Sequence, residues 1–175
     1  MILGVDVSTS ITGFAIISED GDVVELSYCD LRKYKTFFGK CLKMREFTLN
    51  LIEKYSGKIK HMYIEQPFTF FNSGGSSAKT MASLQRFNGV TSWMLYEALE
   101  MTPEYIGATQ ARKKIGIKVP RGEKAKVYVL NHLRENEQFE VETTRHGNPK
   151  PQYYDMADAL VIARAGLIIE KENIS

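Results

Sequence analysis

Four acidic side chains stand at sequence positions where an isolated carboxylate is out of place. Asp6 interrupts an apolar N-terminal run, and Glu65 ends a later apolar segment. Asp155 and Asp158 are three residues apart at the start of a C-terminal segment with helical spacing, so both lie on one helix face. Burying a lone ionised carboxylate is costly unless it is paired or bound to a metal ion. The four acids are therefore the candidate chemical groups of this chain.

The four carboxylates are suited to divalent metal ions. Mg²⁺ and Mn²⁺ are hard cations that take oxygen ligands, and without a cation such a cluster would repel itself. Two ions about 4 Å apart can hydrolyse a phosphodiester, one by activating a water molecule and the other by stabilising the leaving oxygen. We therefore expect two ions per active site, held by Asp6, Glu65, Asp155 and Asp158, with Asp6 bridging them.

Each acid also has a structural interpretation. Asp6 could cap the turn through residues 8–10, and Glu65 could be an exposed charge at the end of a strand. Asp155 and Asp158 could be N-terminal carboxylates favoured by the helix dipole. That interpretation does not explain why the two acids continue an apolar row of the same helix.

The rest of the sequence predicts the elements that position these acids. Length 175 and 43% hydrophobic content are enough for one core, so we expect one domain over residues 1–175. Apolar runs, turn residues and helical spacing predict a mixed α/β fold. The expected strands are residues 2–7, 12–18, 23–29, 59–65 and 104–108, and the expected helices are residues 37–55, 78–99, 109–117, 121–135 and 152–171.

Basic residues are concentrated in two blocks, although the net charge of the chain is only +2. Residues 31–60 contain nine basic and two acidic side chains, and residues 109–134 contain eight and one. Two such blocks beside a group of carboxylates favour a face that binds a polyanion. Solvated faces of ordinary helices are the alternative.

A polar segment with unexpected aromatic residues follows the fourth predicted strand. Residues 68–77 combine Phe68, Phe70 and Phe71 with Gly, Ser and Asn, which predicts an exposed loop. Aromatic side chains on such a loop can stack on unpaired bases. The alternative is a local cluster folded back onto the core.

Together these segments resemble RuvC-type Holliday junction resolvases, which belong to the RNase H-like superfamily. The resemblance is carried by ILGVDVSTSITGFAII, YIEQPF, TQARKKIGIKVPRGEKAKVYVLNHL and DMADALVIARAG, which occur in the family's order. It implies an RNase H-like five-stranded mixed β-sheet flanked by α-helices. It also implies a homodimeric, metal-dependent endonuclease that resolves four-way DNA junctions by paired nicks, in recombination, repair or processing of branched DNA.

The resemblance assigns individual residues as well. It makes Asp6, Glu65, Asp155 and Asp158 the metal-binding catalytic acids and Lys124 a catalytic lysine near the scissile phosphate. Many members have a lysine where this chain has Arg112, and Phe68 matches an aromatic at the junction centre. With the second basic block, the expected DNA-binding residues are Phe68, Phe70, Phe71, Arg112, Lys113, Lys114, Lys118, Arg121, Lys124 and Lys126.

The chain departs from the family pattern in two places. Many bacterial members have Pro-Gly after the first Asp, where this chain has Val7-Ser8, and Pro67, Phe70 and Phe71 alter the following loop. This divergence favours a phage-encoded member. Two cysteines, no signal peptide and no apolar stretch of about 20 residues predict a cytoplasmic protein, of the host cell if phage-encoded, without membrane contact.

Other functions are compatible with parts of the sequence. The first strand and turn also resemble the phosphate loop of actin-like or sugar-kinase-like ATPases, but no second phosphate loop is found, so no nucleotide cofactor is expected. An RNase H-like nuclease that cuts RNA/DNA hybrid, ribosomal RNA precursors, flaps or forks is a closer alternative. A junction-binding protein without activity is disfavoured, because it has no use for four acids that repel one another.

Overall fold

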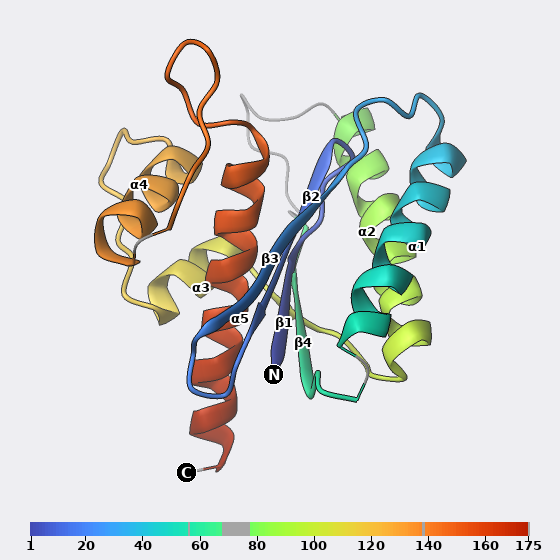
Figure 1. The fold of residues 1–175 in the computed structure, drawn as a ribbon, viewed down its shortest axis with the longest axis horizontal. Coiled ribbons are helices and arrows are strands. Elements are labelled where there is room, and N and C mark those ends of the chain that lie inside the picture. The colour runs from blue at the N-terminus through green and yellow to red at the C-terminus, as the bar shows by residue number, and fades with distance from the viewer. Residues whose placement is uncertain (56, 68–77, 138, 175) are drawn as a thin grey trace.

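The computed structural model describes residues 1–55, 57–67, 78–137 and 139–174. Its centre is a mixed sheet of five strands within these residues, in the order β3-β2-β1-β4-β5. Figure 1 shows the sheet between two groups of helices, with α1 and α2 on one side and α3, α4 and α5 on the other. This arrangement confirms the expected α/β architecture.

The direction of the strands brings two chain segments to one edge of the sheet. β1 (Ile2–Asp6), β2 (Ile11–Ile17) and β3 (Val23–Asp30) form an antiparallel meander. β4 (His61–Glu65) runs parallel to β1, and β5 (Glu104–Ile106) runs parallel to β4. Because parallel strands end at the same edge, Asp6 and Glu65 finish side by side.

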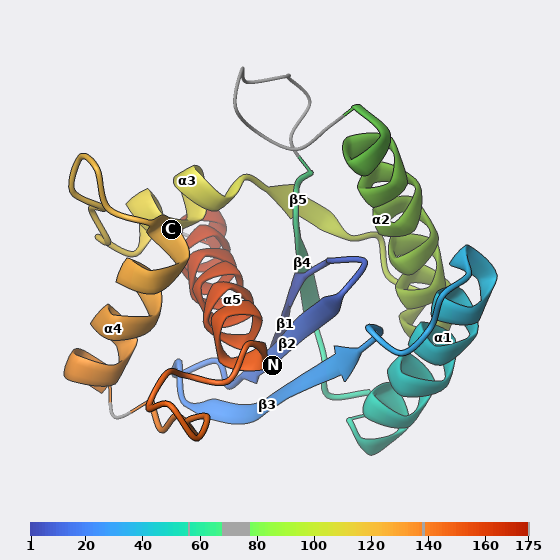
Figure 2. The same ribbon diagram turned by 90° about the horizontal axis from the view of Figure 1, so that it is seen from above.

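Helices α1 (Phe37–Lys54) and α2 (Ala78–Leu99) cover one face of the sheet, as Figure 2 shows. Thr36 caps α1 through its hydroxyl oxygen, which accepts a hydrogen bond from the backbone N–H of Gly39. The apolar face of α1 packs with the sheet in one core cluster, as the helical spacing of its sequence predicts. Its buried residues are Cys41, Met44, Thr48, Leu51 and Ile52.

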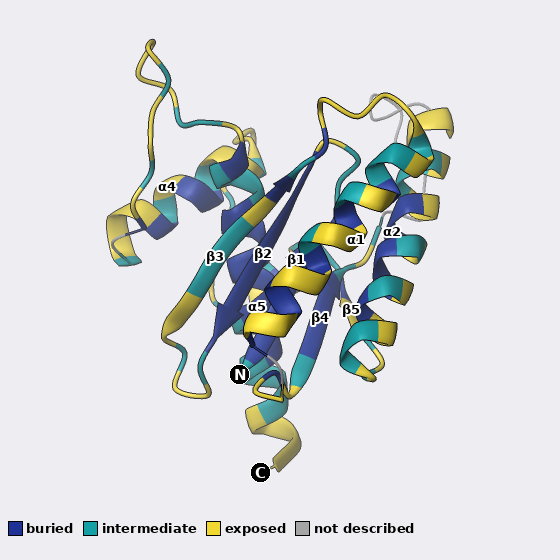
Figure 3. Ribbon diagram, turned by 45° about the vertical axis from the view of Figure 1, so that its right-hand side comes forward, coloured by how far each residue is buried: buried dark blue, intermediate teal, exposed yellow. Residues whose placement is uncertain are grey.

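Helices α3 (Ala108–Lys114), α4 (Ala125–Glu137) and α5 (Gln152–Ile174) cover the other face. Helix α5 lies between the sheet and the two shorter helices (Figure 2). Most residues of its first two-thirds are therefore buried, and Figure 3 colours much of this part of α5 dark blue. The close packing depends on Gly4, where a Cβ atom would lie 2.4 Å from the carbonyl oxygen of Ala159. A small residue in β1 therefore lets α5 approach the sheet.

The segment between α4 and α5 folds back on itself. Thr143 forms an isolated antiparallel bridge with Pro149, and the backbone N–H of Thr144 donates to the carbonyl of Asn148 at 2.7 Å. Gly147 closes the turn with a φ of 79°, a conformation that favours glycine. Figure 1 shows this polar segment projecting beyond the end of the molecule at which α5 begins.

The element boundaries lie within three residues of the sequence-based expectations except at the start of α4. Helix α3 was expected to reach residue 117 but ends at Lys114, and Gly116 just after it has a φ of 82°. Helix α4 was expected from residue 121 but begins at Ala125. The preceding turn is closed by the N–H of Glu123, which donates to the carbonyl of Pro120, and Gly122 has a φ of 93°. In the part of the chain that the structure describes, no helix is long and apolar enough to cross a membrane.

Candidate active site

Three of the four predicted acids converge on one ammonium group. The Nζ atom of Lys126 lies 2.7 Å from Asp155 Oδ1, 3.2 Å from Asp6 Oδ2 and 3.4 Å from Asp158 Oδ2. Lys126 donates hydrogen bonds to Asp155 and Asp6. Carboxylates more than a hundred residues apart in the sequence are therefore neighbours, as expected for a common site.

The backbone packing of α5 on β2 brings the acids together. Gly13 pairs with Asp6 in the antiparallel register, and Gly13 also lies against the start of α5. A Cβ atom at residue 13 would lie 2.1 Å from the carbonyl oxygen of Asp155. The absence of a side chain at this position thus lets Asp155 and Asp158 reach the end of β1.

Glu65 joins this group from the end of β4. The buried side chain of Asn88, on α2, donates a hydrogen bond to the carbonyl oxygen of Glu65 at 3.1 Å. The N–H of the next residue, Gln66, donates to the carbonyl of Ile106 at 3.0 Å. Side-chain and backbone contacts therefore hold the end of β4 where Glu65 acts electrostatically on Asp6 and Asp158.

Burial and mutual repulsion raise the pKa values of all four acids. Burial is the largest cause for Asp6 and brings its pKa to about 6, although Lys126 opposes the shift. Burial, together with the charges of Asp6 and Asp158, raises the pKa of Glu65 to about 9. Burial also raises the pKa values of Asp155 and Asp158, against the effect of Lys126. Perturbed pKa values clustered in this way are typical of functional sites.

Lys126 responds to the same charges in the opposite sense. Burial by itself would lower the pKa of Lys126, but Asp6, Asp155 and Asp158 outweigh burial and raise it above its ordinary value of 10.5. The ammonium therefore stays charged over the neutral pH range. It supplies a positive charge to a group of acids that would otherwise repel one another.

The turn after Asp6 does not require an aspartate cap. The N–H of Ser8 donates to Thr12 Oγ1, and the Thr12 hydroxyl donates to the carbonyl of Ser8 at 2.9 Å. The N–H of Ser10 donates to the hydroxyl of Ser8. These hydroxyl groups close the turn, so the interpretation of Asp6 as a turn cap is not supported. The Asp6 side chain instead accepts a hydrogen bond from Lys126.

The structure also disagrees, wholly or in part, with the purely structural interpretations of Glu65, Asp155 and Asp158. Glu65 is half-buried, which disagrees with an exposed charge at the end of a strand. Asp155 does lie in the first turn of α5, where the helix dipole favours a carboxylate. Its side chain and that of Asp158 nevertheless face Lys126 and the end of β1, so the dipole accounts for only part of their environment.

The predicted DNA-binding basic residues do not all lie near the acids. Arg112 acts on Glu65 and Asp158, where its positive charge partly offsets the rise of both pKa values. Lys114 instead pairs with Glu172, which is about 21 Å along α5 from Asp158 at the usual helical rise. The structure therefore does not bring Lys114 to the acids. The exposed residues among the predicted basic residues are Lys113, Lys118, Arg121, Lys124 and Lys126, and Lys126 also contacts the acids.

The sequence did not predict that the positive charges of Lys126 and Arg32 act on acids of the site. Lys126 was expected only to bind DNA, whereas the expected catalytic lysine, Lys124, lies exposed just before α4. The positive charge of Arg32, in the first basic block, partly offsets the rise in the pKa of Asp155. Lys124 lies before the first turn of α4, whereas Lys126 lies within that turn with its ammonium against the acids. The expected roles of Phe68, Phe70 and Phe71 fall outside the described residues.

The chemistry of the donors suits a hard divalent cation. Four carboxylates meet without a sulfur or imidazole ligand among them, which is the preference of Mg²⁺ and Mn²⁺. Among the described residues, however, no three His, Cys, Asp or Glu side chains are already arranged as the ligands of one metal ion. The space between Asp6, Asp155 and Asp158 is taken by the Lys126 ammonium.

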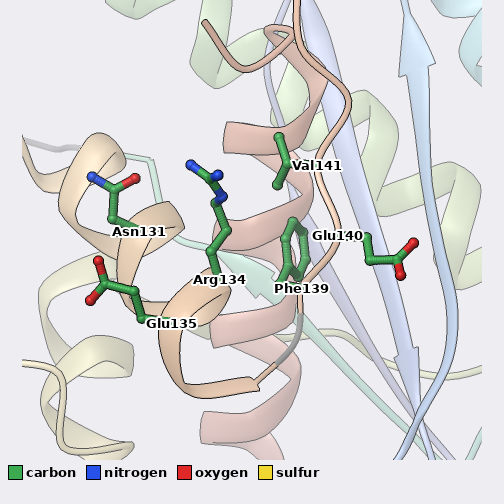
Figure 4. A pocket seen from close by; sticks show the side chains of 6 residues that line it. All are labelled: Asn131, Arg134, Glu135, Phe139, Glu140 and Val141. Carbon is green, nitrogen blue, oxygen red and sulfur yellow. The ribbon is translucent and has the colours of Figure 1, made fainter. Parts of the chain in front are cut away.

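A pocket of about 540 Å³ lies elsewhere, between the C-terminal half of α4 and the segment that follows it. Figure 4 shows its lining side chains. It contains none of the four acids and mixes both signs of charge, so it is not part of the carboxylate site. Its lining residues are Asn131, Arg134, Glu135, Phe139, Glu140 and Val141.

The fold and the site define an α/β protein with a carboxylate cluster at the open edge of its sheet. No protein-family model and no curated protein sequence matches the chain. Its fold is that of RuvC from Thermus thermophilus. A structure of that RuvC in complex with a Holliday junction substrate matches with a TM-score of 0.68 and 13% identity, covering 98% of this chain and 94% of the other.

A second structure of Thermus thermophilus RuvC gives the same result. Its TM-score is 0.66 at 15% identity, and the match covers 98% of this chain and 96% of the other. Coverage is nearly complete in both directions, so the likeness extends over almost the whole chain rather than one motif. The comparisons therefore confirm the RuvC-type fold, including its five-stranded mixed sheet.

Proposed function

We propose that this chain is a metal-dependent endonuclease that resolves four-way DNA junctions by paired, symmetric nicks. The observation that carries the proposal is the meeting of Asp6, Glu65, Asp155 and Asp158 at one edge of a RuvC-type fold. The similar RuvC structure contains a Holliday junction substrate. That likeness supports branched DNA as the substrate here.

The four acids would hold the metal ions. Mg²⁺ or Mn²⁺ supplies an activated water and stabilises the charge that develops on the phosphodiester, and two ions per site are proposed. Asp6 would be a ligand common to both ions, a role consistent with its place at the end of the central strand β1 and its interactions with Glu65 and Asp158. Glu65 approaches from β4, and Asp155 and Asp158 approach from α5.

Basic side chains near the acids support binding of a phosphate backbone. The positive charge of Arg112 acts on Glu65 and Asp158, while that of Arg32 acts on Asp155. Phosphate contacts of this kind give affinity that does not depend on base sequence. Lys113, Lys118, Arg121 and Lys124 are proposed to extend the DNA-binding surface, and Lys124 to stabilise phosphate charge.

A homodimer is the proposed working form. A four-way junction has two-fold symmetry, and a two-fold dimer presents two identical sites to it. Helix α2 supports this assembly, because Trp93 and Tyr96 are 58% and 48% exposed on its outer surface. Gly89 on the same helix has open space around it, so a second backbone could approach closely. We propose α2 as the centre of the dimer interface.

A substrate panel tests the proposed function. Labelled four-way junction, matched duplex and RNA/DNA hybrid would be incubated with the protein in Mg²⁺ and in EDTA. The proposal predicts nicks in two opposed strands of the junction, dependent on the metal and absent from the duplex and the hybrid. Cleavage of the hybrid or of a single flap, with an intact junction, would instead assign another RNase H-like nuclease activity.

A further inference from the structure

Lys126 has an unusual position for a DNA-binding lysine. Its ammonium contacts acids from both β1 and α5, at 2.7 to 3.4 Å, rather than pointing to solvent. The side chain is 52% exposed, whereas those of Asp6 and Asp158 are each only 7% exposed. Lys126 therefore covers the opening of the carboxylate cluster on the solvent side.

The position of Lys126 is fixed by the packing of α4. Val129, Leu130 and Leu133 are buried against the core that contains α5. Lys126 precedes them by three, four and seven residues, which places it on the same helix face. Its stem is thus directed toward α5, and only the flexible end of the side chain decides where the ammonium lies.

The charge of the cluster explains why the ammonium lies there. Several buried carboxylates without a nearby cation would be strongly unfavourable. Among the described residues, Lys126 is the basic side chain that forms ion pairs with Asp6, Asp155 and Asp158. A divalent ion bound by the same oxygens would lie within a few ångströms of this ammonium, and the two cations would repel each other.

We propose that Lys126 is a tethered counter-cation that holds the carboxylate cluster in its metal-free form and leaves it when a divalent ion binds. The inference rests on the metal site of the proposed function but does not depend on the DNA substrate. The half-exposed side chain can turn to solvent without moving α4. Lys126 thereby lowers the affinity of the site for divalent metal ions and raises the metal concentration at which the site is half-saturated.

Calorimetry with Mn²⁺ and metal-free protein, without DNA, tests this role. Lys126→Gln is expected to bind Mn²⁺ at least about tenfold more tightly than the wild type, because a nearby positive charge has been removed. Lys124→Gln is the matched control, since it removes the same charge from an exposed position two residues away. Its affinity for Mn²⁺ is expected to match the wild type. Equal or weaker binding by Lys126→Gln would overturn the proposal.

A second measurement uses the wild-type chain, in case Lys126→Gln does not fold without metal. Nitrogen-detected NMR of the lysine side chains would follow the Lys126 ammonium, assigned with Lys126→Arg, as Mg²⁺ is added. The signal is expected to shift to that of a solvated lysine as the site saturates. An unchanged signal at saturation would contradict displacement. A failure to cleave junctions, with both results as expected, would reject only the proposed DNA function.

Discussion

Gly13 and Asp155 lie closer together than any side chain at residue 13 would allow. A Cβ atom there would stand 2.1 Å from the Asp155 carbonyl oxygen and 2.8 Å from the backbone nitrogen of Met156. These are backbone atoms, which cannot turn aside as a flexible side chain can. The register of β2 and the position of α5 are thus coupled at the residue that pairs with Asp6.

Gly13→Ala is therefore expected to displace the start of α5 from the sheet. The free energy of unfolding should fall by about 2 kcal/mol or more, because overpacking forces the backbone to shift. Cleavage should be lost even where the variant folds, since Asp155 and Asp158 move with the helix. Chemical denaturation and a junction cleavage assay measure the two effects.

Gly107→Ala is the control for that substitution. Gly107 has open space around it and a φ of −70° that alanine adopts, so the unfolding free energy should change by less than about 1 kcal/mol. If Gly13→Ala were as stable and as active as the wild type, the close approach of β2 and α5 would not be what positions the acids.

The stability of the metal-free protein is expected to fall as pH rises from about 5 to 9. The pKa of Asp6 is raised from 3.8 to about 6 and that of Glu65 from 4.5 to about 9. In this window the folded state binds more protons than the unfolded state, so raising the pH favours unfolding. Denaturant unfolding in EDTA at pH 5, 7 and 9 measures the trend.

Glu65→Gln should flatten the upper part of that profile, because it removes the group that titrates near pH 9. Lys126 stays charged throughout the window, since its pKa lies above the ordinary 10.5. Divalent metal ions compete with the same protons, so metal affinity should rise with pH over this range. A stability that rises between pH 5 and 9 would contradict the burial of these carboxylates.

Asn88→Ala is expected to loosen the end of β4. The substitution removes the hydrogen bond of 3.1 Å to the Glu65 carbonyl and leaves that oxygen without its side-chain donor. The unfolding free energy should fall by about 1–3 kcal/mol, and the cleavage rate should fall more than junction affinity. Asn50→Ala, at an exposed position of α1, should change neither quantity. An Asn88→Ala variant with normal cleavage would show that Glu65 does not depend on α2.

Trp93→Glu tests the proposed dimer. Sedimentation should show a dimeric wild type and a monomeric variant, because a charge would then be buried at the centre of the interface. Ile174→Glu, at the exposed end of α5, should remain dimeric. A monomeric wild type, or a dimeric Trp93→Glu variant, would contradict the assignment of α2 as the interface.

Much of the fold and most of the acid cluster could be predicted from sequence because both follow from local patterns. Asp6 interrupts an apolar strand, and Asp155 and Asp158 share a helix face with an apolar row. Charged side chains at positions that the pattern predicts to be buried indicate a function. The predicted ends of β4 and of α2 agree with the structure. Local pattern also explains the largest boundary error, since Gly122 and the turn at Pro120 delay the start of α4.

The basic residues of the site were harder to predict, because two lysines close together in the sequence, Lys124 and Lys126, were both candidates for the position beside the acids. Family resemblance selects Lys124, whereas the structure places Lys126 at the acids. The signal that distinguishes them is helical spacing, since Lys126 is in register with Val129 and Leu133. Arg32 could not be selected in this way, because its proximity to Asp155 depends on how β3 and α5 pack.

The most direct test of the central claim is the activity of Asp6→Asn on a four-way junction in Mg²⁺. The substitution keeps the shape of the side chain but removes the carboxylate at the end of β1. If the acid cluster is the catalytic centre, the wild type nicks opposed strands, while Asp6→Asn binds the junction with similar affinity and leaves all four strands intact. Full cleavage by Asp6→Asn would place the chemistry elsewhere.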